Sequence, residues 1–143
     1  MAKKKSERAR AKARAWYWFS RYIRLTHCIE EYGTPEKGDC VTCKETFTFD
    51  KLDAGHFVPG RTDAVLFDEN NSHGQCRKCN RFRQGRWVEY FFYMRDRYGL
   101  EETMRVMGLT FSNKRYHDSD FRVIAETYRL KCRIIEEKFK NGN

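Results

Sequence analysis

The cysteines are the first residues of this chain whose type and spacing suggest chemistry. Four of the six form two Cys-x-x-Cys pairs, Cys40/Cys43 and Cys76/Cys79, with 32 residues between the pairs. Each pair can supply two thiolates from a tight turn, and two such pairs suit one tetrahedral zinc ion. Because four thiolates fill the coordination shell, we expect a structural zinc that closes the intervening segment into a loop.

The loop between the cysteine pairs carries histidine, asparagine and carboxylate side chains that suit phosphodiester hydrolysis. This reaction needs a base that activates water, a cation that stabilises charge in the transition state, and donors that position the phosphate. His56 suits proton transfer because the ordinary histidine pKa is about 6.5. A buried, hydrogen-bonded structural imidazole is the alternative for this residue.

The charge of the chain points to a polyanionic partner. The 143 residues, the size of one ordinary domain, carry a net charge of +9. The charge is uneven, because residues 1–24 carry +8, residues 25–76 carry −6 and residues 77–86 carry +5. Basic segments therefore flank an acidic loop, and DNA is the partner that we expect.

Two sets of basic residues are the expected DNA contacts. The first surrounds the second cysteine pair and consists of Arg77, Lys78, Arg81, Arg83 and Arg86. Residues 77–86 contain five basic side chains and no acidic one, which favours contact with phosphate over a solvated helix face. The second set is the N-terminal arm, with Lys3, Lys4, Lys5, Arg8, Arg10, Lys12 and Arg14. This arm is either helical or a disordered tail as far as about Arg14, and both forms permit phosphate contact.

The hydrophobic pattern predicts helices at both ends and a small β-structure between them. We expect a helix from Ala2 to about Leu25 and a loop from His27 to Asp39. Residues 46–49 and 52–58 are expected to pair as a hairpin that carries His56, followed by an irregular loop from Arg61 to Ser72.

The hydrophobic pattern after Cys79 predicts helices. A wide apolar stripe predicts a helix that Gly99 ends, and a short helix should run from Leu100 to Met107. A last long helix begins at Asp118 or Ser119, and its stripe from Phe121 to Phe139 is either core or a dimer seam. No apolar run is long enough to span a membrane, so we expect a cytoplasmic protein, in a bacterial host if a phage encodes it.

With the cysteine pairs and Asn71, the Gly55-His56 dipeptide resembles the HNH, or His-Me finger, endonucleases. The strings DAGHF and QCRKCN and the aromatic-rich helix before them look most like the phage NinG (Rap) recombination nucleases, over roughly residues 10–98. This resemblance implies an α+β, mainly helical fold with a small zinc-bound ββα core flanked by N- and C-terminal helices. We divide the chain into a basic arm (1–24), a nuclease core (25–98) and a helical extension (99–143).

The resemblance also implies roles for individual residues. His56, Asn71 and Asn80 are the catalytic positions, and Asn80 is a ligand of a catalytic Mg²⁺ or Mn²⁺ through its amide oxygen. A turn residue is the alternative for Asn71 and a helix cap for Asn80. Most relatives place an aspartate directly before the catalytic histidine, where this chain has Gly55.

The carboxylate ligand must therefore come from elsewhere in the chain. Asp53 is our choice, provided that a β-bulge at Gly55 brings it to the face of His56. His73, Asp68 and Glu69 are the substitutes, and His73 can also serve as a phosphate contact or a loop cap.

The expected activity is metal-dependent endonucleolytic cleavage of DNA. The resemblance implies branched recombination intermediates, such as Holliday junctions or D-loops, as substrates, and the symmetry of a junction suggests a homodimer. Two alternatives stay open: a nonspecific or site-specific nicking HNH nuclease, and a non-catalytic zinc module that binds DNA and recruits recombination proteins.

Overall fold

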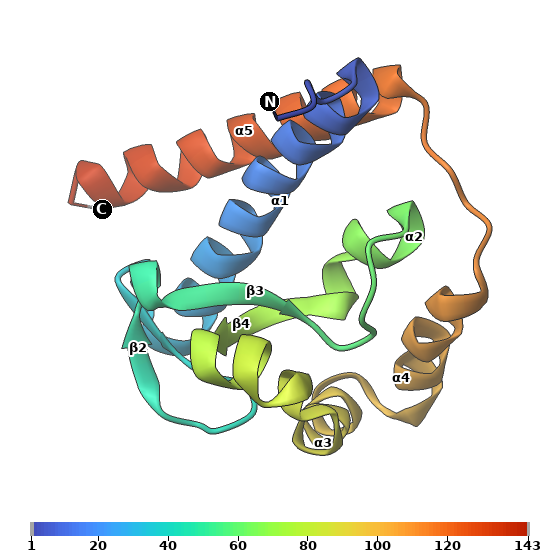
Figure 1. The fold of residues 1–143 in the computed structure, drawn as a ribbon. Coiled ribbons are helices and arrows are strands. Elements are labelled where there is room, and N and C mark those ends of the chain that lie inside the picture. The colour runs from blue at the N-terminus through green and yellow to red at the C-terminus, as the bar shows by residue number, and fades with distance from the viewer. Residues whose placement is uncertain (1, 143) are drawn as a thin grey trace.

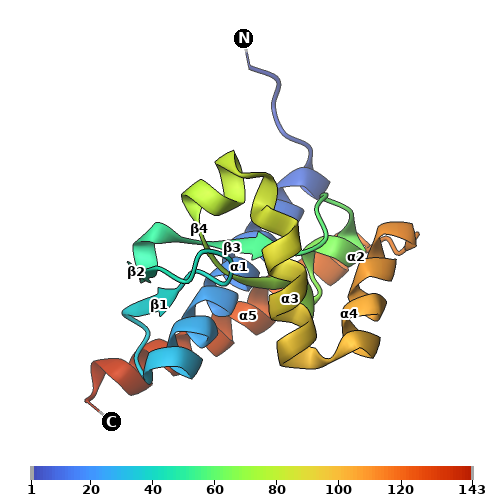
Figure 2. The same ribbon diagram turned by 90° about the horizontal axis from the view of Figure 1, so that it is seen from below.

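The computed structural model describes residues 2–142 and has an α+β, mainly helical fold, as predicted (Figure 1). Two long helices, α1 (Glu7–Tyr32) and α5 (Asp118–Lys140), pack against each other, and α1 also contacts the strands. The strands form two separate two-stranded sheets. Figure 2, viewed from below, shows α3 and α4 on the side of the sheets that faces the viewer and α5 behind them.

Helix α1 begins and ends at residues suited to those positions. The Ser6 hydroxyl accepts a hydrogen bond from the Ala9 amide, and Gly33 takes the left-handed conformation (φ 68°) that ends the helix. The predicted loop from His27 to Asp39 is therefore wrong at both ends, because residues 27–32 are the last part of α1 and Lys37–Asp39 form strand β1. The helix also crosses the predicted domain boundary at residue 24 without interruption; residues 1 and 143 of that division lie outside the described part.

The predicted hairpin is wrong in its strand pairing. Strand β2 (Thr46–Thr48) pairs with β1 (Lys37–Asp39), and β3 (Leu52–His56) pairs with β4 (Ser72–Cys76), both antiparallel. The first cysteine pair forms the turn between β1 and β2, where the Lys44 amide donates to the Cys40 carbonyl at 2.9 Å. The first cysteine pair thus lies in the turn of the β1–β2 sheet. The second pair begins at Cys76, the last residue of β4, which is the partner of β3.

The predicted bulge at Gly55 is also wrong. Residues 52–56 pair one to one with residues 76–72. A Cβ atom on Gly55 would overlap the side chain of Gln75, which is fully buried and donates to the Thr42 hydroxyl and the Gly85 carbonyl. Glycine at this position therefore provides room for a buried side chain on the neighbouring strand.

The segment after the second cysteine pair is broken into turns. A π-helical turn (Lys78–Phe82) and a 3-10 turn (Gln84–Arg86) precede α3 (Trp87–Tyr98). All three residues of the 3-10 turn have positive φ angles, so no continuous helix runs from the second cysteine pair into α3. The expected helix end at Gly99 and the short helix α4 (Leu100–Met107) are confirmed, whereas the predicted irregular loop contains a short helix, α2 (Asp63–Leu66).

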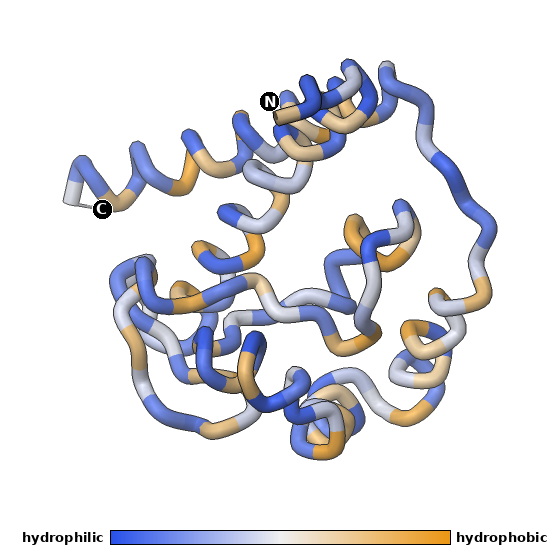
Figure 3. The backbone as a smooth tube through the Cα atoms, in the orientation of Figure 1, coloured by the Kyte–Doolittle hydropathy of each residue, from blue (hydrophilic) through white to orange (hydrophobic). Residues whose placement is uncertain are grey.

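Helix α5 closes the molecule over α1. A polar, extended connection at residues 112–117 leads to it from a 3-10 turn (Gly108–Phe111), and polar and apolar segments alternate along its length (Figure 3). His117 and Asp120 form a reciprocal capping box at its start. Phe121, Ala125 and Cys132 are buried, so part of the predicted stripe is core. Within residues 2–142, no helix has the length and apolar character needed to cross a membrane.

Candidate metal centre and histidine site

The four paired cysteines lie together at one end of the β3–β4 sheet. Their sulfur atoms are all within 4.8 Å of one another, and the Sγ atoms of Cys43 and Cys76 are 3.9 Å apart. Two thiolates on one tetrahedral zinc, each bonded at about 2.3 Å, stand about 3.8 Å apart. The cluster can therefore hold a metal ion such as zinc. Four protein ligands would leave no coordination position for water, which makes the centre structural.

The protein surroundings favour a thiolate at one of these cysteines. Burial raises the pKa of Cys40, but hydrogen bonds with the Cys43 backbone and the Thr42 hydroxyl outweigh it and lower that pKa to about 7. Metal binding requires the deprotonated sulfur, so this lowering assists it.

His56 stands at the end of β3 with one ring nitrogen free. The indole of Trp16 on α1 stacks on the imidazole, with ring centroids 4.9 Å apart. The Nε2 atom is buried, and no described residue forms a hydrogen bond with it. Burial, with a smaller contribution from Arg61, lowers the pKa of His56 to about 4, although a hydrogen bond with the Leu66 backbone acts in the opposite direction. His56 is therefore a neutral imidazole with an unused nitrogen at neutral pH.

Asp53 and Asn80 face the same hollow as His56. The three residues line a pocket of about 400 Å³. The Asn80 amide donates to the Asp53 carboxylate at 2.9 Å, and Arg81 donates to both oxygens of that carboxylate at 2.9 and 3.0 Å. The hollow, called the basic pocket below, is otherwise rich in guanidinium groups, from Arg24, Arg61, Arg77 and Arg81. Such a hollow can bind a phosphate group.

Asn71 fixes the loop that follows His56. Its side chain is fully buried and accepts from the Val58 amide at 2.7 Å. The same side chain donates to the carbonyls of Val58 and Val65, at 3.2 and 3.0 Å. Asn71 does not line the basic pocket, so it acts on His56 only by fixing the backbone that follows it.

The substitute metal ligands lie elsewhere, which corrects the expectation for His73. Its Nδ1 and Nε2 atoms are 2.9 and 2.7 Å from the hydroxyls of Tyr90 and Tyr98, so neither nitrogen is free. Burial lowers its pKa well below the ordinary histidine value. The carboxylates of Asp68 and Glu69 pair with Arg105 and Lys131. None of the three residues lines the basic pocket.

Comparison with known proteins shows the family. A model of the family described as Bacteriophage Lambda NinG protein matches residues 2–138. This chain belongs to the NinG family. The match extends beyond residues 10–98, where the sequence motifs lie, and includes almost all of α5.

Curated relatives resemble part of this NinG-family chain. Protein ninG of Escherichia phage 933W is 32% identical over 97 residues, which make up 67% of this chain and 47% of that protein. Protein ninG of Salmonella phage P22 is 28% identical over 99 residues, 68% of this chain and 48% of its own length. The chain thus spans about half the length of the curated relatives it matches, and no solved structure matches it.

The structure divides the expected DNA contacts of this NinG-family chain into two places. Five basic residues lie within or just after the second cysteine pair: Arg77, Lys78, Arg81, Arg83 and Arg86. Of these, Arg77 and Arg81 pair with Asp53 and Arg86 pairs with Glu89; all except Arg86 are exposed.

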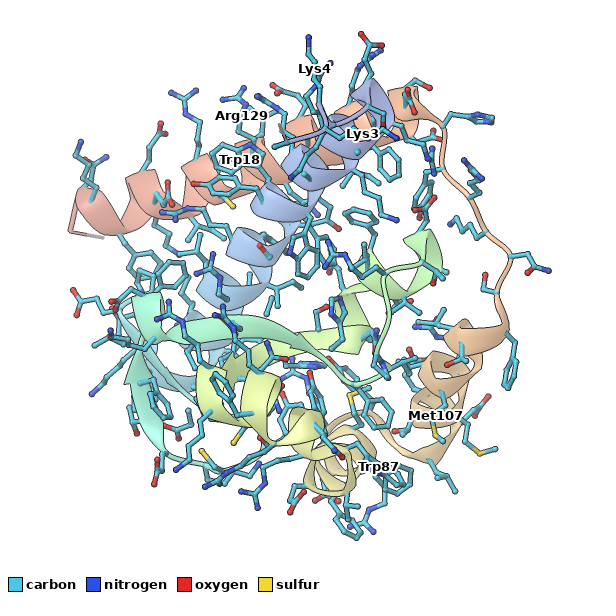
Figure 4. All side chains as sticks on the ribbon, viewed as in Figure 1. Lys3, Lys4, Trp18, Trp87, Met107 and Arg129 are labelled. Atoms are coloured by element: carbon cyan, nitrogen blue, oxygen red, sulfur yellow. The ribbon has the colours of Figure 1, made fainter. Side chains whose placement is uncertain are left out.

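The basic residues of the N-terminal arm lie far from the second cysteine pair. Arg8 and Lys12 are held by the buried carboxylate of Asp63, at 3.1 and 2.8 Å, so part of this set ties α1 to α2. The remaining members are exposed: Lys3, Lys4, Lys5, Arg10 and Arg14. Figure 4 shows Lys3 and Lys4 at the top of the view and Trp87 at the bottom, and Figure 2 shows the segment before α1 projecting away from the rest of the chain.

Three residues of α1 in the basic pocket were not predicted from the sequence. Trp16, Ser20 and Arg24 line it together, four residues apart, so they share one face of the helix. This i, i+4, i+8 spacing is the signal that could have found them. Arg61, in the loop after β3, offered no pattern in the sequence.

Proposed function

We propose that this protein is a metal-dependent DNA endonuclease of the His-Me finger type in which His56 is the general base. The observation that carries the proposal is the unpartnered, buried Nε2 atom of His56, beside Asp53 and Asn80 in a pocket rich in arginine. A structural histidine ordinarily has its polar nitrogens satisfied, because a buried unpaired polar atom costs free energy. A nitrogen kept free inside a basic hollow suits proton transfer.

Six residues of the basic pocket have a part in this reaction. Neutral His56 would take a proton from the attacking water, for which its lowered pKa keeps it competent below neutral pH. Arg24, Arg61 and Arg77 would bind the phosphate. Asp53 and the amide oxygen of Asn80 would hold Mg²⁺ or Mn²⁺, which supplies positive charge to stabilise the transition state.

The substrate class comes from the family resemblance. Branched recombination intermediates, such as Holliday junctions and D-loops, are the expected DNA, and by family analogy the products carry a 5′-phosphate and a 3′-hydroxyl. A four-way junction offers two symmetric strands, so a homodimer is the expected form on that substrate. The host cytoplasm is where such DNA would be met.

A panel of DNA structures tests the proposal. Zinc-loaded protein is incubated in Mg²⁺ or Mn²⁺ with a labelled four-way junction, a flap and a plain duplex, and the products are resolved on denaturing gels. We expect cleavage of the branched DNAs in preference to the duplex. Equal cleavage of all three would support a nonspecific nicking nuclease instead.

Two histidine variants separate an enzyme from a DNA-binding module. His56→Ala should lose cleavage but retain DNA binding, measured by gel shift. His117→Asn is the matched control, because His117 is exposed at the start of α5 and asparagine can still cap the helix. If the parent protein binds DNA and never cleaves it in either metal, the non-catalytic module replaces this proposal.

The metal-ligand assignment has a separate test, because Asp53 also forms two hydrogen bonds with Arg81. Mn²⁺ binding by the zinc-loaded protein is measured by isothermal titration calorimetry. Asp53→Asn should weaken that binding, whereas Asp50→Asn, which alters an exposed carboxylate outside the basic pocket, should not. Unchanged Mn²⁺ affinity in Asp53→Asn would remove Asp53 from the ligand set.

A further inference from the structure

A second hollow adjoins the basic pocket and has a different character. It encloses about 680 Å³, and its walls include the apolar side chains of Phe57, Val58, Pro59, Trp87 and Met107. We call it the apolar pocket. His56 and Asn80 line both hollows, so these two residues stand at the border between a basic space and an apolar one.

The aromatic residue of the apolar pocket is open to solvent. Trp87 is the first residue of α3, and its side chain is 60% exposed. No aromatic ring of residues 2–142 stacks against it. Figure 4 shows Trp87 and Met107 on the same side of the molecule, from α3 and α4. A large flat indole in this position offers a stacking surface with no partner in the chain.

A second exposed aromatic ring lies next to Asn80. Phe82 is 82% exposed and stands between Arg81 and Arg83, in the π-helical turn that carries Asn80. Exposed apolar side chains among basic residues can enter DNA as wedges that separate stacked bases. The surroundings of the candidate catalytic residues thus combine phosphate-binding groups with two rings suited to nucleobases.

We propose that the apolar pocket receives one unstacked nucleobase of the DNA strand whose phosphate lies in the basic pocket. The inference rests on the proposed function and adds a base-binding subsite to it. The strand would pass His56 and Asn80, with a phosphate among the arginines and the adjoining base on Trp87. The pocket volume lies in the range of small-ligand sites, and Gln84 and Thr110 on its walls can bond to base edges.

This arrangement favours one class of DNA. A base in a duplex must leave its stack to enter the pocket, which costs free energy, whereas an unpaired base pays less. Stacking on an aromatic side chain stabilises a base regardless of its identity. The subsite therefore selects DNA with unpaired nucleotides, such as those at a branch point or a gap, without reading sequence.

Binding of two matched DNAs tests the inference. The probes are a fluorescein-labelled duplex and the same duplex with a two-nucleotide bulge. Their affinities for the zinc-loaded protein are measured by anisotropy in Ca²⁺, without chelators, so that neither cleavage nor zinc loss intervenes. We expect the bulged DNA to bind at least about 5-fold more tightly, the lower end of the effect of one stacked base.

Variants locate the preference in the apolar pocket. Trp87→Ala should bind both DNAs alike, and Trp87→Phe, which keeps a ring, should retain the preference. Met107→Ala tests the same pocket from α4 and should reduce the preference. Phe92→Ala is the control, because Phe92 is an exposed aromatic residue of α3 that does not line the pocket. Zinc content and the thermal midpoint show that each variant is folded.

Two results would overturn the inference. One is equal affinity of the wild-type protein for the two DNAs, which decides the matter even if Trp87→Ala does not fold. The other is a preference that folded Trp87→Ala retains. Loss of self-association in Trp87→Ala, seen by light scattering with the DNA preference unchanged, would assign the pocket to a second copy of the chain.

The inference and the proposed function can fail separately. If the protein shows the binding preference but never cleaves DNA, the endonuclease proposal falls and the subsite stands. If the protein cleaves junctions but binds the two duplexes alike, the subsite falls and the nuclease stands.

Discussion

His56 and His73 stand on neighbouring strands but have opposite surroundings. His56 is the last residue of β3, and His73 on β4 is the register partner of Gly55 on β3. Burial lowers the pKa of both imidazoles. His73 has both nitrogens bonded to tyrosine hydroxyls, whereas the Nε2 atom of His56 has no partner among the described residues. The free nitrogen, and not the lowered pKa, is therefore what marks a candidate catalytic histidine in this fold.

The two regions also differ in what surrounds them. His56 opens on two hollows, with arginines on one side and apolar rings on the other. His73 contacts the rings of Tyr90, Tyr93 and Tyr98, which come from α3. The imidazole of His73 thus joins the sheet to α3, whereas that of His56 lies at the border between the two pockets.

The largest expected effect is the unfolding of both histidine regions when a cysteine of the cluster is replaced. The cluster lies at the end of the β3–β4 pair where Leu52 faces Cys76. A structural zinc contributes about 10–16 kcal/mol, comparable to the whole stability of a domain. Cys43→Ser should therefore abolish zinc binding and unfold the protein, as measured by elemental analysis and circular dichroism.

A cysteine outside the cluster provides the control for zinc. Cys132 is buried between α5 and α1, where its thiol is 3.7 Å from the Trp18 carbonyl. Cys132→Ala should keep one zinc per chain and remain folded. A Cys43→Ser protein that melts at the wild-type temperature without zinc would contradict a structural metal.

A smaller effect should separate the histidines by stability. His73→Phe removes the hydrogen bond with the half-buried Tyr98 hydroxyl and the one with the Tyr90 hydroxyl, and each lost hydrogen bond costs about 0.5–1.5 kcal/mol. Tyr90 loses less, because its hydroxyl also donates to the Gly55 carbonyl at 2.6 Å. His56→Gln should cost less than His73→Phe, because His56 has one hydrogen bond to lose, with the Leu66 backbone, and His73 has two. Urea denaturation of the two variants measures the difference, and the reverse order would contradict the assignment.

The smallest effect concerns pH. The folded pKa of each histidine lies below the ordinary value of about 6.5, so the unfolded chain binds more protons. The free energy of unfolding should therefore fall as pH drops from about 6.5 toward 4, and neither histidine should contribute above that window. In an NMR titration of the folded protein, His56 should titrate near pH 4. A midpoint near 6.5 would show that its imidazole is not buried.

The sequence was informative where the pattern is local. Spacing alone identified the cysteine cluster, Gly99 marked the end of α3, and the short helix α4 was predicted with its observed bounds. The basic residues around the second cysteine pair gave the positive charge beside Asn80. The helix end and the basic segment depend on neighbours within a few residues of one another, and each cysteine pair is a local motif although 32 residues separate the two pairs.

The sequence failed where distant segments decide the structure. Strand β3 pairs with β4 and not with β2, and no local signal distinguishes the two pairings. Gly55 was interpreted as a bulge residue, but the buried Gln75 on the other strand explains it. The difference between His56 and His73 depends on Tyr90 and Tyr98, which are 17 and 25 residues from His73 along the chain.

The rate of junction cleavage by two histidine variants under single-turnover conditions shows whether His56 is the general base. Zinc-loaded His56→Ala and His73→Phe are compared in Mg²⁺, with rates normalised to the folded, DNA-bound fraction. We expect His56→Ala to cleave about 10²- to 10⁴-fold more slowly, because this is the usual contribution of a general base, and His73→Phe to retain the wild-type rate. A His56→Ala rate equal to wild type, or equal losses in both variants, would contradict the assignment of His56 as the base.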